Sequence, residues 1–270
     1  MFQSGATKCI IITTDPKPEL VQRCMRTWQK MLPDYEVMLW DAKRIEEEIR
    51  CEFVDEAIRV RKWAFAADYV RVFAVYRYGG IWLDSDVEVK KPFDDLLHQR
   101  MFIGQEAATF FSFNTAFKET HLTSHCFGAE PGHPFLKKCL DYYQGRHFIT
   151  STNGDLPQHM RYDMTLLPLI QSQLLQAFGY KEQAYFYNQK QCISEGICVY
   201  PSYYFDAPKS RSMKNVYCIH QCMESWGRGG VPRPRTYGTW KQILYWGMMD
   251  FVNLIPRLFG KEICLCFCKW

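Results

Sequence analysis

Long runs of one residue type are absent from this 270-residue chain, and their absence excludes several kinds of protein. No internal repeat or low-complexity tract appears, and no run of lysine and arginine is long enough to make nucleic acid the main partner. The net charge of +4 and the pI of about 8.4 are mildly basic. Anionic diphosphates and an anionic membrane surface therefore stay compatible with the composition.

An N-terminal signal sequence and zinc-binding spacing are also lacking, although the chain holds 12 cysteines. Without a signal sequence, a disulfide framework has no oxidising compartment. Cys218 and Cys222 are close enough to share a metal, but no second pair matches them, and Cys264, Cys266 and Cys268 alternate too tightly. We therefore expect reduced cysteines that serve as small hydrophobic residues.

The order of periodic segments predicts an α/β fold. Residues 9–12 and 36–40 read as strands, while apolar residues between 20 and 32 fall at helical spacing and further helices follow through 45–60. This alternation indicates a doubly wound sheet with the ligand outside the strand ends. With 47% hydrophobic residues, the chain buries about three quarters of its unfolded surface, which is enough for one large domain.

The most informative segment begins with an acid and an arginine one helical turn apart. Asp68 and Arg71 stand at i and i+3 on a helix predicted from about 63 to 78, so both project from one face and can grip one ligand. Gly79 and Gly80 end that helix where a positive φ is needed. Taken alone, such a pair is more often an ordinary surface ion pair.

Two alternating aspartates follow a short apolar strand at residues 81–83. If the chain stays extended, Asp84 and Asp86 share a face and place two hard oxygen donors side by side, which suits Mg²⁺ or Mn²⁺ carrying a diphosphate. Two such acids alone are commonly a solvated turn. The fixed order of helix pair, glycines, strand and acids favours a metal-dependent sugar-nucleotide site.

This region resembles the DXD-containing glycosyltransferases of family 32, which include bacterial capsular-polysaccharide enzymes and fungal Golgi mannosyltransferases, with clostridial glucosylating toxins as distant relatives. The resemblance covers roughly residues 18 to 230. It rests on the segments WAFAADYVR (63–71), YRYGGIWLDSDV (76–87), KPF (91–93), FGAEPGHP (127–134), YPSYYF (200–205), and His220 with Glu224, Ser225 and Trp226.

The resemblance implies a GT-A fold, a nucleotide-sugar donor, a divalent cation and retention of anomeric configuration. It implies that Asp68 and Arg71 hold sugar hydroxyls, that Asp84 touches ribose and sugar, and that Asp86 binds the metal. The implied catalytic residues are Asp68, Arg71, Asp84 and Asp86. The implied donor-binding residues are Asp68, Arg71, Gly80, Trp82, Asp84, Ser225 and Trp226, and the implied metal ligands are Asp84, Asp86, His220 and Ser225.

Two departures from the family pattern concern the donor. Relatives usually have tyrosine at the position of Trp82, and their first strand is followed by a histidine and a tryptophan where this chain has Thr13, Thr14 and Asp15. Contacts to the nucleotide from the first strand therefore do not carry over.

The remaining segments predict accessory roles. The region 99–187, rich in aromatic residues and histidine, is expected to shape an acceptor pocket, although its histidines, His121, His125, His133, His147 and His159, read first as ordinary residues. The loop 227–234 either closes over a diphosphate or is a plain linker. Beyond Trp240 an apolar stripe too interrupted to span a bilayer either lies in a membrane interface or packs on the catalytic domain.

We therefore expect a catalytic domain at residues 1–230 and a basic loop with an amphipathic tail at 231–270. The expected reaction moves a hexose, most favourably from a UDP-sugar, to a surface polysaccharide or a polyprenyl-diphosphate-linked glycan, with Mn²⁺ or Mg²⁺ as cofactor. The expected location is cytoplasmic, peripheral on the inner face of a bacterial plasma membrane. The alternatives are a sugar-nucleotide pyrophosphorylase or hydrolase and a non-catalytic sugar-binding module.

Overall fold

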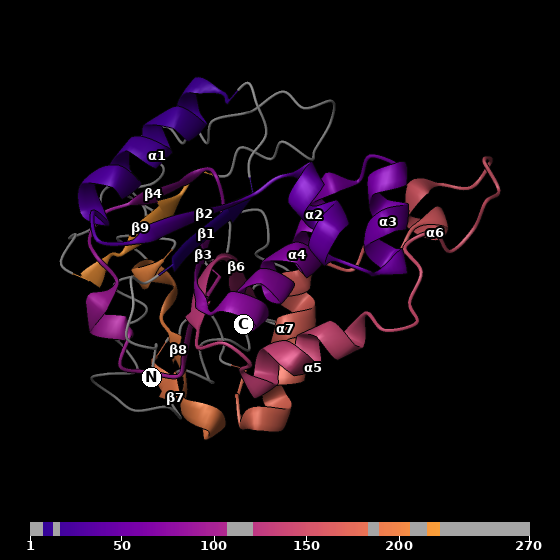
Figure 1. The fold of residues 1–270 in the computed structure, drawn as a ribbon. Coiled ribbons are helices and arrows are strands. Elements are labelled where there is room, and N and C mark those ends of the chain that lie inside the picture. Colours follow the sequence, from indigo (N-terminus) through magenta and orange to yellow (C-terminus); the bar gives the residue numbers. More distant parts are fainter. Residues whose placement is uncertain (1–7, 13–16, 107–120, 183–188, 206–214, 222–270) are drawn as a thin grey trace, which may run out of the picture.

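A computed structural model of the chain describes residues 8–12, 17–106, 121–182, 189–205 and 215–221. A seven-stranded sheet with the order β2-β1-β3-β6-β5-β8-β7 runs through its centre (Figure 1). Its strands are β1 (Lys8–Ile12), β2 (Glu36–Trp40), β3 (Gly80–Leu83), β5 (Met101–Gln105), β6 (Leu122–Ala129), β7 (Gln191–Cys192) and β8 (Ile197–Tyr200).

The sheet is mixed. β1 is parallel to both β2 and β3, and β5 is parallel to β8, but β6 runs antiparallel to β3 and β5, as β7 does to β8. The α/β prediction is thereby confirmed, with antiparallel strands inserted into the expected parallel order. Strands β1, β2 and β3 end at the same edge of the sheet, where a ligand is expected.

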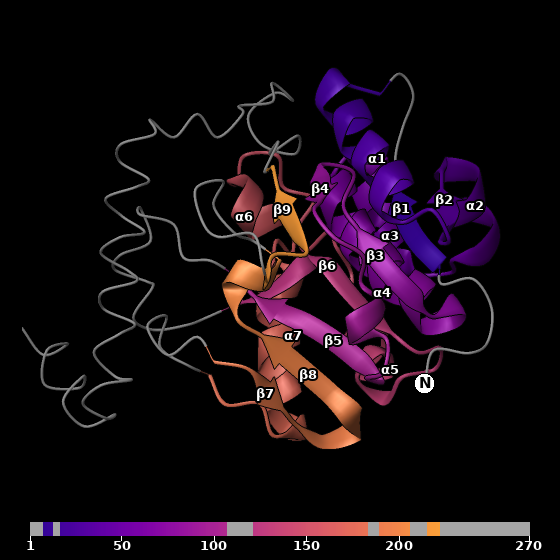
Figure 2. The same cartoon turned by 90° about the vertical axis from the view of Figure 1, so that its left-hand side faces the viewer.

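Helices cover both faces of the sheet (Figure 2). One face packs against α3, α4, α5 and α7 in the larger hydrophobic core, and the other packs against α1, β4 and the 93–96 segment. The helices are α1 (Glu19–Met31), α2 (Ala42–Glu48), α3 (Glu52–Arg59), α4 (Trp63–Tyr78), α5 (Pro134–Tyr142), α6 (Gln158–Arg161) and α7 (Leu167–Leu175). Short 3-10 helices lie at Asp94–Leu96, Gln176–Phe178, Ser194–Gly196 and Ser202–Tyr204.

A second, two-stranded sheet is antiparallel and joins distant parts of the chain. It pairs β4 (Val87–Val89) with β9 (Cys218–His220), with Val87 opposite His220 and Val89 opposite Cys218. Both strands are short, and the indole nitrogen of Trp28 on α1 donates a hydrogen bond to the carbonyl oxygen of Val87 at 2.7 Å. Through this small sheet, β9 lies beside the segment that holds Asp84 and Asp86.

The helix and strand around the predicted site lie where the sequence places them. Helix α4 spans Trp63–Tyr78, and Gly79 follows it with φ of +64°. A Cβ atom at Gly79 would lie 2.6 Å from the Cδ atom of Pro131, so glycine is required for space as well as for backbone conformation. Gly79 thus fixes the direction in which the chain enters β3.

The expectation of reduced cysteines is wrong for one pair. Cys192 and Cys198 form a disulfide between β7 and β8, where the antiparallel register sets them directly opposite each other. The turn at Ser194–Gly196 creates this pairing, and Glu195 and Gly196 both have positive φ there. Cys24, Cys51, Cys126, Cys139 and Cys218 form no disulfide, and all except the half-buried Cys51 are buried.

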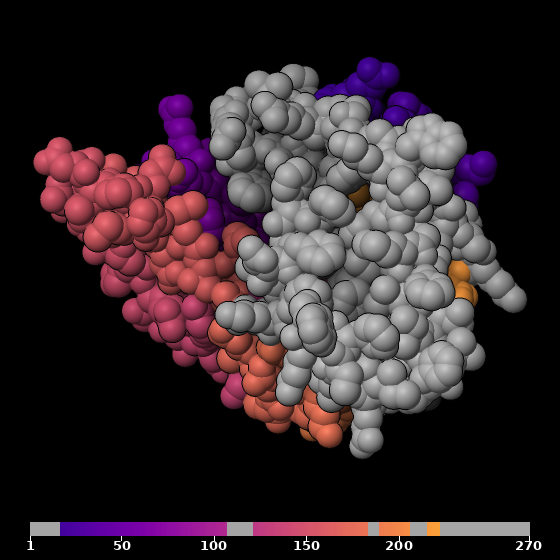
Figure 3. Space-filling model, turned by 180° about the vertical axis from the view of Figure 1, so that it is seen from behind, coloured from indigo at the N-terminus to yellow at the C-terminus, as the bar shows by residue number. Residues whose placement is uncertain are grey.

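Within the described ranges, no helix is both long enough and apolar enough to cross a membrane. The loop 227–234 and the apolar stripe beyond Trp240 fall outside these ranges, as do Thr13, Thr14 and Asp15, so their predicted roles stay predictions. Figure 3 draws such residues in grey. The proposed boundary between residues 230 and 231 lies there too.

Candidate functional site

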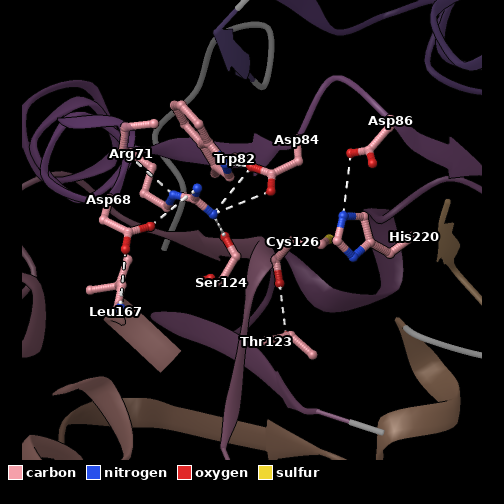
Figure 4. A network of polar contacts seen from close by, with 11 residues as sticks. Asp68, Arg71, Trp82, Asp84, Asp86, Thr123, Ser124, Cys126, Leu167 and His220 are labelled. Atoms are coloured by element: carbon pink, nitrogen blue, oxygen red, sulfur yellow. Dashed lines mark hydrogen bonds and ion pairs between the residues drawn. The ribbon is translucent and has the colours of Figure 1, made fainter. Parts of the chain in front are cut away.

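A buried arginine on α4 connects three elements at the carboxyl end of β3 (Figure 4). Nη1 of Arg71 lies 3.2 Å and 3.3 Å from the two carboxylate oxygens of Asp84 and donates to the carbonyl oxygen of Ser124 on β6 at 2.8 Å. Nη2 lies 3.3 Å from Oδ1 of Asp68, one turn earlier on the helix. The predicted pair therefore does share one face of α4, and that face points at the acids.

Asp68 is held from two sides. Its Oδ2 accepts a hydrogen bond from the backbone amide of Leu167 at 3.1 Å. Leu167 is the first residue of α7, where the amide has no partner within the helix. Burial raises the pKa of Asp68 to about 6, and the nearby Arg71 guanidinium opposes that rise. The carboxylate thus ties α7 to α4 while keeping a pKa close to neutral pH.

Asp84 is fixed by Trp82 as well as by Arg71. The indole nitrogen of Trp82 donates to Oδ1 of Asp84 at 2.7 Å, and the Arg71 guanidinium carbon lies 5.5 Å from the centre of the Trp82 ring. Trp82 is only 1% exposed, so in this structure it supports Asp84, whose side chain is 23% exposed. Gly80 begins β3 opposite Ala129, at the far end of the strand from Asp84, so the structure does not bring Gly80 to the acids.

The chain does not stay extended after β3, so the two aspartates do not share one strand face. The amide of Val87 donates to the carbonyl oxygen of Asp84 at 3.0 Å, which closes a turn. Asp84 points toward Arg71, and Asp86 points toward His220, whose Nε2 lies 3.3 Å from Oδ1 of Asp86 (Figure 4). The expectation that both aspartates share one strand face is wrong, because the hydrogen bond between Val87 and Asp84 turns the chain away from the extended conformation.

The turn nevertheless keeps three of the four predicted metal ligands together. One ligand atom from each of Asp84, Asp86 and His220 lies within 4.8 Å of the other two. The small sheet delivers the histidine, because His220 pairs with Val87 and the amide of Gln221 donates to the carbonyl oxygen of Asp86 at 3.0 Å. Two carboxylates and one imidazole are a donor set for a divalent cation.

The other two residues predicted for this end of the domain, Ser225 and Trp226, lie outside the described ranges. The structure therefore brings together Asp68, Arg71, Trp82, Asp84, Asp86 and His220 from the predicted set.

The sequence analysis treated His125, which lies behind the predicted metal ligands, first as an ordinary residue. The rings of His125 on β6 and His220 stack with centroids 4.3 Å apart and an angle of 17° between planes. Nε2 of His125 lies 3.1 Å from the carbonyl oxygen of Phe205, and burial, followed by the charge of His220, keeps the pKa of His125 well below its ordinary value. The one feature from which this position could be predicted is the pairing of β6, which carries His125, with β3.

A second group of possible metal-ligating side chains has a structural role instead. Glu52, Glu56 and His147 also bring ligand atoms within 4.8 Å of one another. The Glu56 carboxylate, however, accepts from the backbone amide of Ile149 at 2.9 Å, and lies 3.3 Å from Nδ1 of His147 and 3.6 Å from Nη2 of Arg59. This carboxylate fastens α3 to the segment after α5.

A cavity of about 560 Å³ lies between residues of the segment 150–169 and His121. It is lined by residues from the middle third of the chain, including His121, His159 and Asp163, while His125, His133 and His147 do not line it. Leu166 also lines it and immediately precedes Leu167, whose amide binds Asp68. The middle third of the chain thus contains a hollow, and its expected role in binding an acceptor stays a prediction.

Comparison with curated proteins finds fungal enzymes with partial matches. Inositol phosphoceramide mannosyltransferase 3 of Schizosaccharomyces pombe is 29% identical over 140 residues, which are 50% of this chain and 36% of that protein. Glucan organizing enzyme 1 of Cryptococcus neoformans is 34% identical over 85 residues, or 32% of this chain and 23% of that protein. The match thus spans about a third or less of the length of these relatives.

Among solved structures, the PaToxG glycosyltransferase aligns with a TM-score of 0.41 and 15% identity, covering 64% of this chain and 69% of that one. The galactosyltransferase LgtC, in complex with donor and acceptor sugar analogs, aligns with a TM-score of 0.37 and 11% identity over 89% of this chain and 95% of its own.

The broadest match is to a family model. The model described as "Capsular polysaccharide synthesis protein" matches residues 13–192, which span the helix pair, β3, both aspartates and the cavity. This match covers 180 of the 270 residues. The chain belongs to the capsular polysaccharide synthesis protein family.

Proposed function

We propose that this protein is a metal-dependent, retaining glycosyltransferase of the GT-A type that moves a hexose from a nucleotide diphosphate, most favourably UDP, to a glycan acceptor. The observation that carries the proposal is the group of Asp84, Asp86 and His220, with ligand atoms within 4.8 Å, at the end of β3 beside the buried Arg71. Membership of a polysaccharide-synthesis family and partial identity to a mannosyltransferase support it.

The donor set fits a divalent cation. Carboxylate oxygens suit Mg²⁺ and Mn²⁺ alike, but the imidazole of His220 favours Mn²⁺, because Mg²⁺ strongly prefers oxygen. Asp84, Asp86 and His220 would hold the ion, with Ser225 as a further proposed ligand and Trp226 beside the diphosphate. When bound, the ion would neutralise charge on the diphosphate as it departs.

Arg71 and Asp68 would orient the donor sugar. In the described structure Arg71 uses four of its five N–H groups: Nε donates to the carbonyl oxygen of Ala67, Nη1 serves Asp84 and Ser124, and Nη2 faces Asp68. One N–H on Nη2 is left for a sugar hydroxyl. Each oxygen of Asp68 has a second lone pair for the same purpose.

The proposed displacement needs no covalent enzyme intermediate. The bond between the anomeric carbon and the phosphate oxygen breaks, the bond from that carbon to the acceptor oxygen forms on the same face, and the acceptor proton passes to the departing phosphate oxygen. The chain's task is then to position both substrates and to exclude water. Trp82 and Ser124 contribute by holding Asp84 and Arg71 in place.

The decisive experiment screens UDP- and GDP-hexoses for Mn²⁺-dependent hydrolysis. Asp86→Asn should lower turnover by about a hundredfold, the scale of losing one principal electrostatic stabiliser. Glu52→Gln, in the other cluster of donors, is the matched control and should leave turnover unchanged. Activity that survives a chelator in the wild type would exclude the metal-dependent mechanism.

The alternatives give different results in the same screen. A pyrophosphorylase or hydrolase would form or split the diphosphate as its main reaction even when acceptors are present. A sugar-binding module would bind hexose without metal and turn nothing over.

We also propose that residues 231–270 attach the protein to the inner face of a bacterial plasma membrane, near a polyprenyl-diphosphate-linked acceptor. Truncation at Gly238 should then abolish sedimentation with anionic liposomes while donor hydrolysis persists. Unfolding of the truncated protein would instead mean that the segment belongs to the core.

A further inference from the structure

We propose that His125 is a positioning residue for the cation site, because its ring holds the imidazole of His220 in the orientation that faces Asp86. His125 is not one of the three grouped ligands, so it acts through His220. This inference rests on the proposed transferase function and adds to it a residue that sets how tightly, and how selectively, the site binds its metal.

The two imidazole rings are stacked almost parallel. Their centroids lie 4.3 Å apart, and the angle between their planes is 17°. His125 is buried and His220 is half-buried, so the inner ring covers one face of the outer ring. On the outer ring, Nε2 of His220 lies 3.3 Å from Oδ1 of Asp86 (Figure 4). The stack blocks orientations in which the imidazole would turn into the protein, and the ring therefore stays directed at the carboxylate.

His125 is itself fixed by the segment that follows β8. Its Nε2 lies 3.1 Å from the carbonyl oxygen of Phe205, and the thiol of Cys218, on the strand of His220, donates to the same oxygen at 3.4 Å. Phe205 is fully buried, and a Cβ atom at Gly104 would lie 2.5 Å from its ring, so this ring packs directly on the backbone of β5. One fixed carbonyl oxygen thus ties His125 to the strand that carries His220.

A bulge in β6 holds the residue in this direction. Between two paired positions, the single residue Gly104 of β5 lies opposite residues 123–126 of β6. The hydroxyl of Thr123 accepts from the amide of Gly104 at 3.0 Å and lies 3.2 Å from the carbonyl oxygen of Cys126, which closes the bulge (Figure 4). Bulges beside active sites commonly redirect a side chain. Here the redirected side chain is that of His125.

The same bulge contacts the rest of the site. The carbonyl oxygen of Ser124 accepts from Arg71 at 2.8 Å, and that of His125 accepts from the backbone amide of Asp84 at 2.9 Å. Two consecutive residues of β6 therefore contact the arginine proposed to orient the sugar and two of the proposed metal ligands. A histidine that only filled the core would affect stability alone, whereas one that orients a ligand also affects metal binding.

The expected effect on metal binding is large. Loss of a group that orients a metal-ligating histidine typically lowers metal affinity by about 10- to 100-fold. Because Mg²⁺ prefers oxygen ligands, a misplaced imidazole should weaken Mg²⁺ binding less than Mn²⁺ binding. Loss of His125 should therefore reduce both the affinity for Mn²⁺ and the preference for Mn²⁺ over Mg²⁺.

The test measures metal binding to the whole protein in the absence of donor. Free Mn²⁺ is followed by electron paramagnetic resonance, and Mg²⁺ is measured by competition. His125→Ala should bind Mn²⁺ about tenfold more weakly, with a smaller loss for Mg²⁺. The double variant His125→Ala/His220→Ala should bind Mn²⁺ as weakly as His220→Ala alone, because His125 acts through that ligand.

Two conservative variants separate the stack from the fold. His125→Gln keeps a donor for the carbonyl oxygen of Phe205 but has no ring, so it should bind Mn²⁺ as weakly as His125→Ala. His125→Phe keeps a ring against His220 and should recover most of the affinity. In the metal-free protein, nuclear magnetic resonance of labelled histidines should show a ring-current shift on His220 that disappears in His125→Gln.

His133→Ala is the matched control. His133 is also buried, and its Nε2 lies 3.1 Å from a backbone carbonyl oxygen, that of Glu195 in the turn between β7 and β8. Its loss should lower the unfolding temperature but leave the affinity for Mn²⁺ and the shift on His220 unchanged.

Several results would overturn the proposal. They are unchanged Mn²⁺ affinity in His125→Ala or His125→Gln, an equal loss in His133→Ala, and fully additive losses in the double variant. Binding that depends on His220 but not on His125 would reject the positioning role alone. Mn²⁺ affinity that is the same in His220→Ala and the wild type would reject the metal site of the proposed function as well.

Discussion

Replacing Arg71 with methionine should destabilise the protein strongly, because it leaves the buried Asp68 without its cation. Nη2 of Arg71 lies 3.3 Å from Asp68, and both side chains are buried. Removing one partner of a buried ion pair typically costs about 3–5 kcal/mol. For a chain of this size the unfolding temperature should fall by roughly 6–20 °C at pH 8.

The loss should depend on pH in a defined direction. Burial already raises the pKa of folded Asp68 to about 6, above its value in an unfolded chain, and removal of Arg71 raises it further. A carboxyl with a raised folded pKa takes up a proton on folding, so stability declines as pH rises from the unfolded to the folded pKa. The defect of Arg71→Met should therefore be greatest above the folded pKa and shrink as pH falls toward 5.

Thermal unfolding followed by circular dichroism at pH 8 and pH 5 measures both effects. The double variant Arg71→Met/Asp68→Asn removes the stranded charge and should recover part of the loss at pH 8. Arg59→Met is the matched control, because Arg59 also pairs at i,i+3 spacing, with Glu56, but is mostly exposed, so its loss should stay within about 1 kcal/mol. A loss for Arg71→Met that equals the control, or that is the same at both pH values, would refute the reasoning.

Three further predictions concern other features. If ionised Asp68 holds donor hydroxyls, kcat/KM should rise with pH to a plateau with a midpoint near 6, and a profile flat from pH 5 to 8 would contradict this role. Gln171 on α7 is fully buried, and its amide has no hydrogen-bond partner among the described residues, so Gln171→Met should raise the unfolding temperature by roughly 2–4 °C. A decrease would mean that the amide is bonded in solution. Gly79→Ala should lower the free energy of unfolding, measured by chemical denaturation, by more than about 1 kcal/mol, because Gly79 has a positive φ and lies against Pro131. Gly154 has open space around it, so an equal loss for Gly154→Ala would contradict that explanation.

Local patterns in the sequence predicted the elements that position the site. Helix α4, the positive φ at Gly79 and the strand β3 follow from apolar runs and from a glycine pair, which act over a few residues. The i,i+3 spacing likewise predicted that Asp68 and Arg71 share a face. These signals need no knowledge of the rest of the chain.

Contacts between distant segments were harder to predict from the sequence. The stacking of His125 on His220 and the amide of Leu167 on Asp68 depend on the order of strands in the sheet and on where α7 begins. The disulfide at Cys192 depends on a tight turn that the residue types alone did not reveal. The turn after Asp84 was missed because extension of β3 was assumed, although one hydrogen bond to Val87 ends it.

The two-stranded sheet of β4 and β9 would couple binding of the proposed cation to folding. Asp86 lies next to β4 and His220 lies in β9, so an ion held by both would cross-link segments that are far apart in the chain. Three residue pairs give such a small sheet little stability of its own. An ion that binds only the closed arrangement stabilises it by mass action. Mn²⁺ should therefore slow amide hydrogen exchange in β9 far more than in the central sheet, and its release would loosen that one strand while the rest of the fold stays intact.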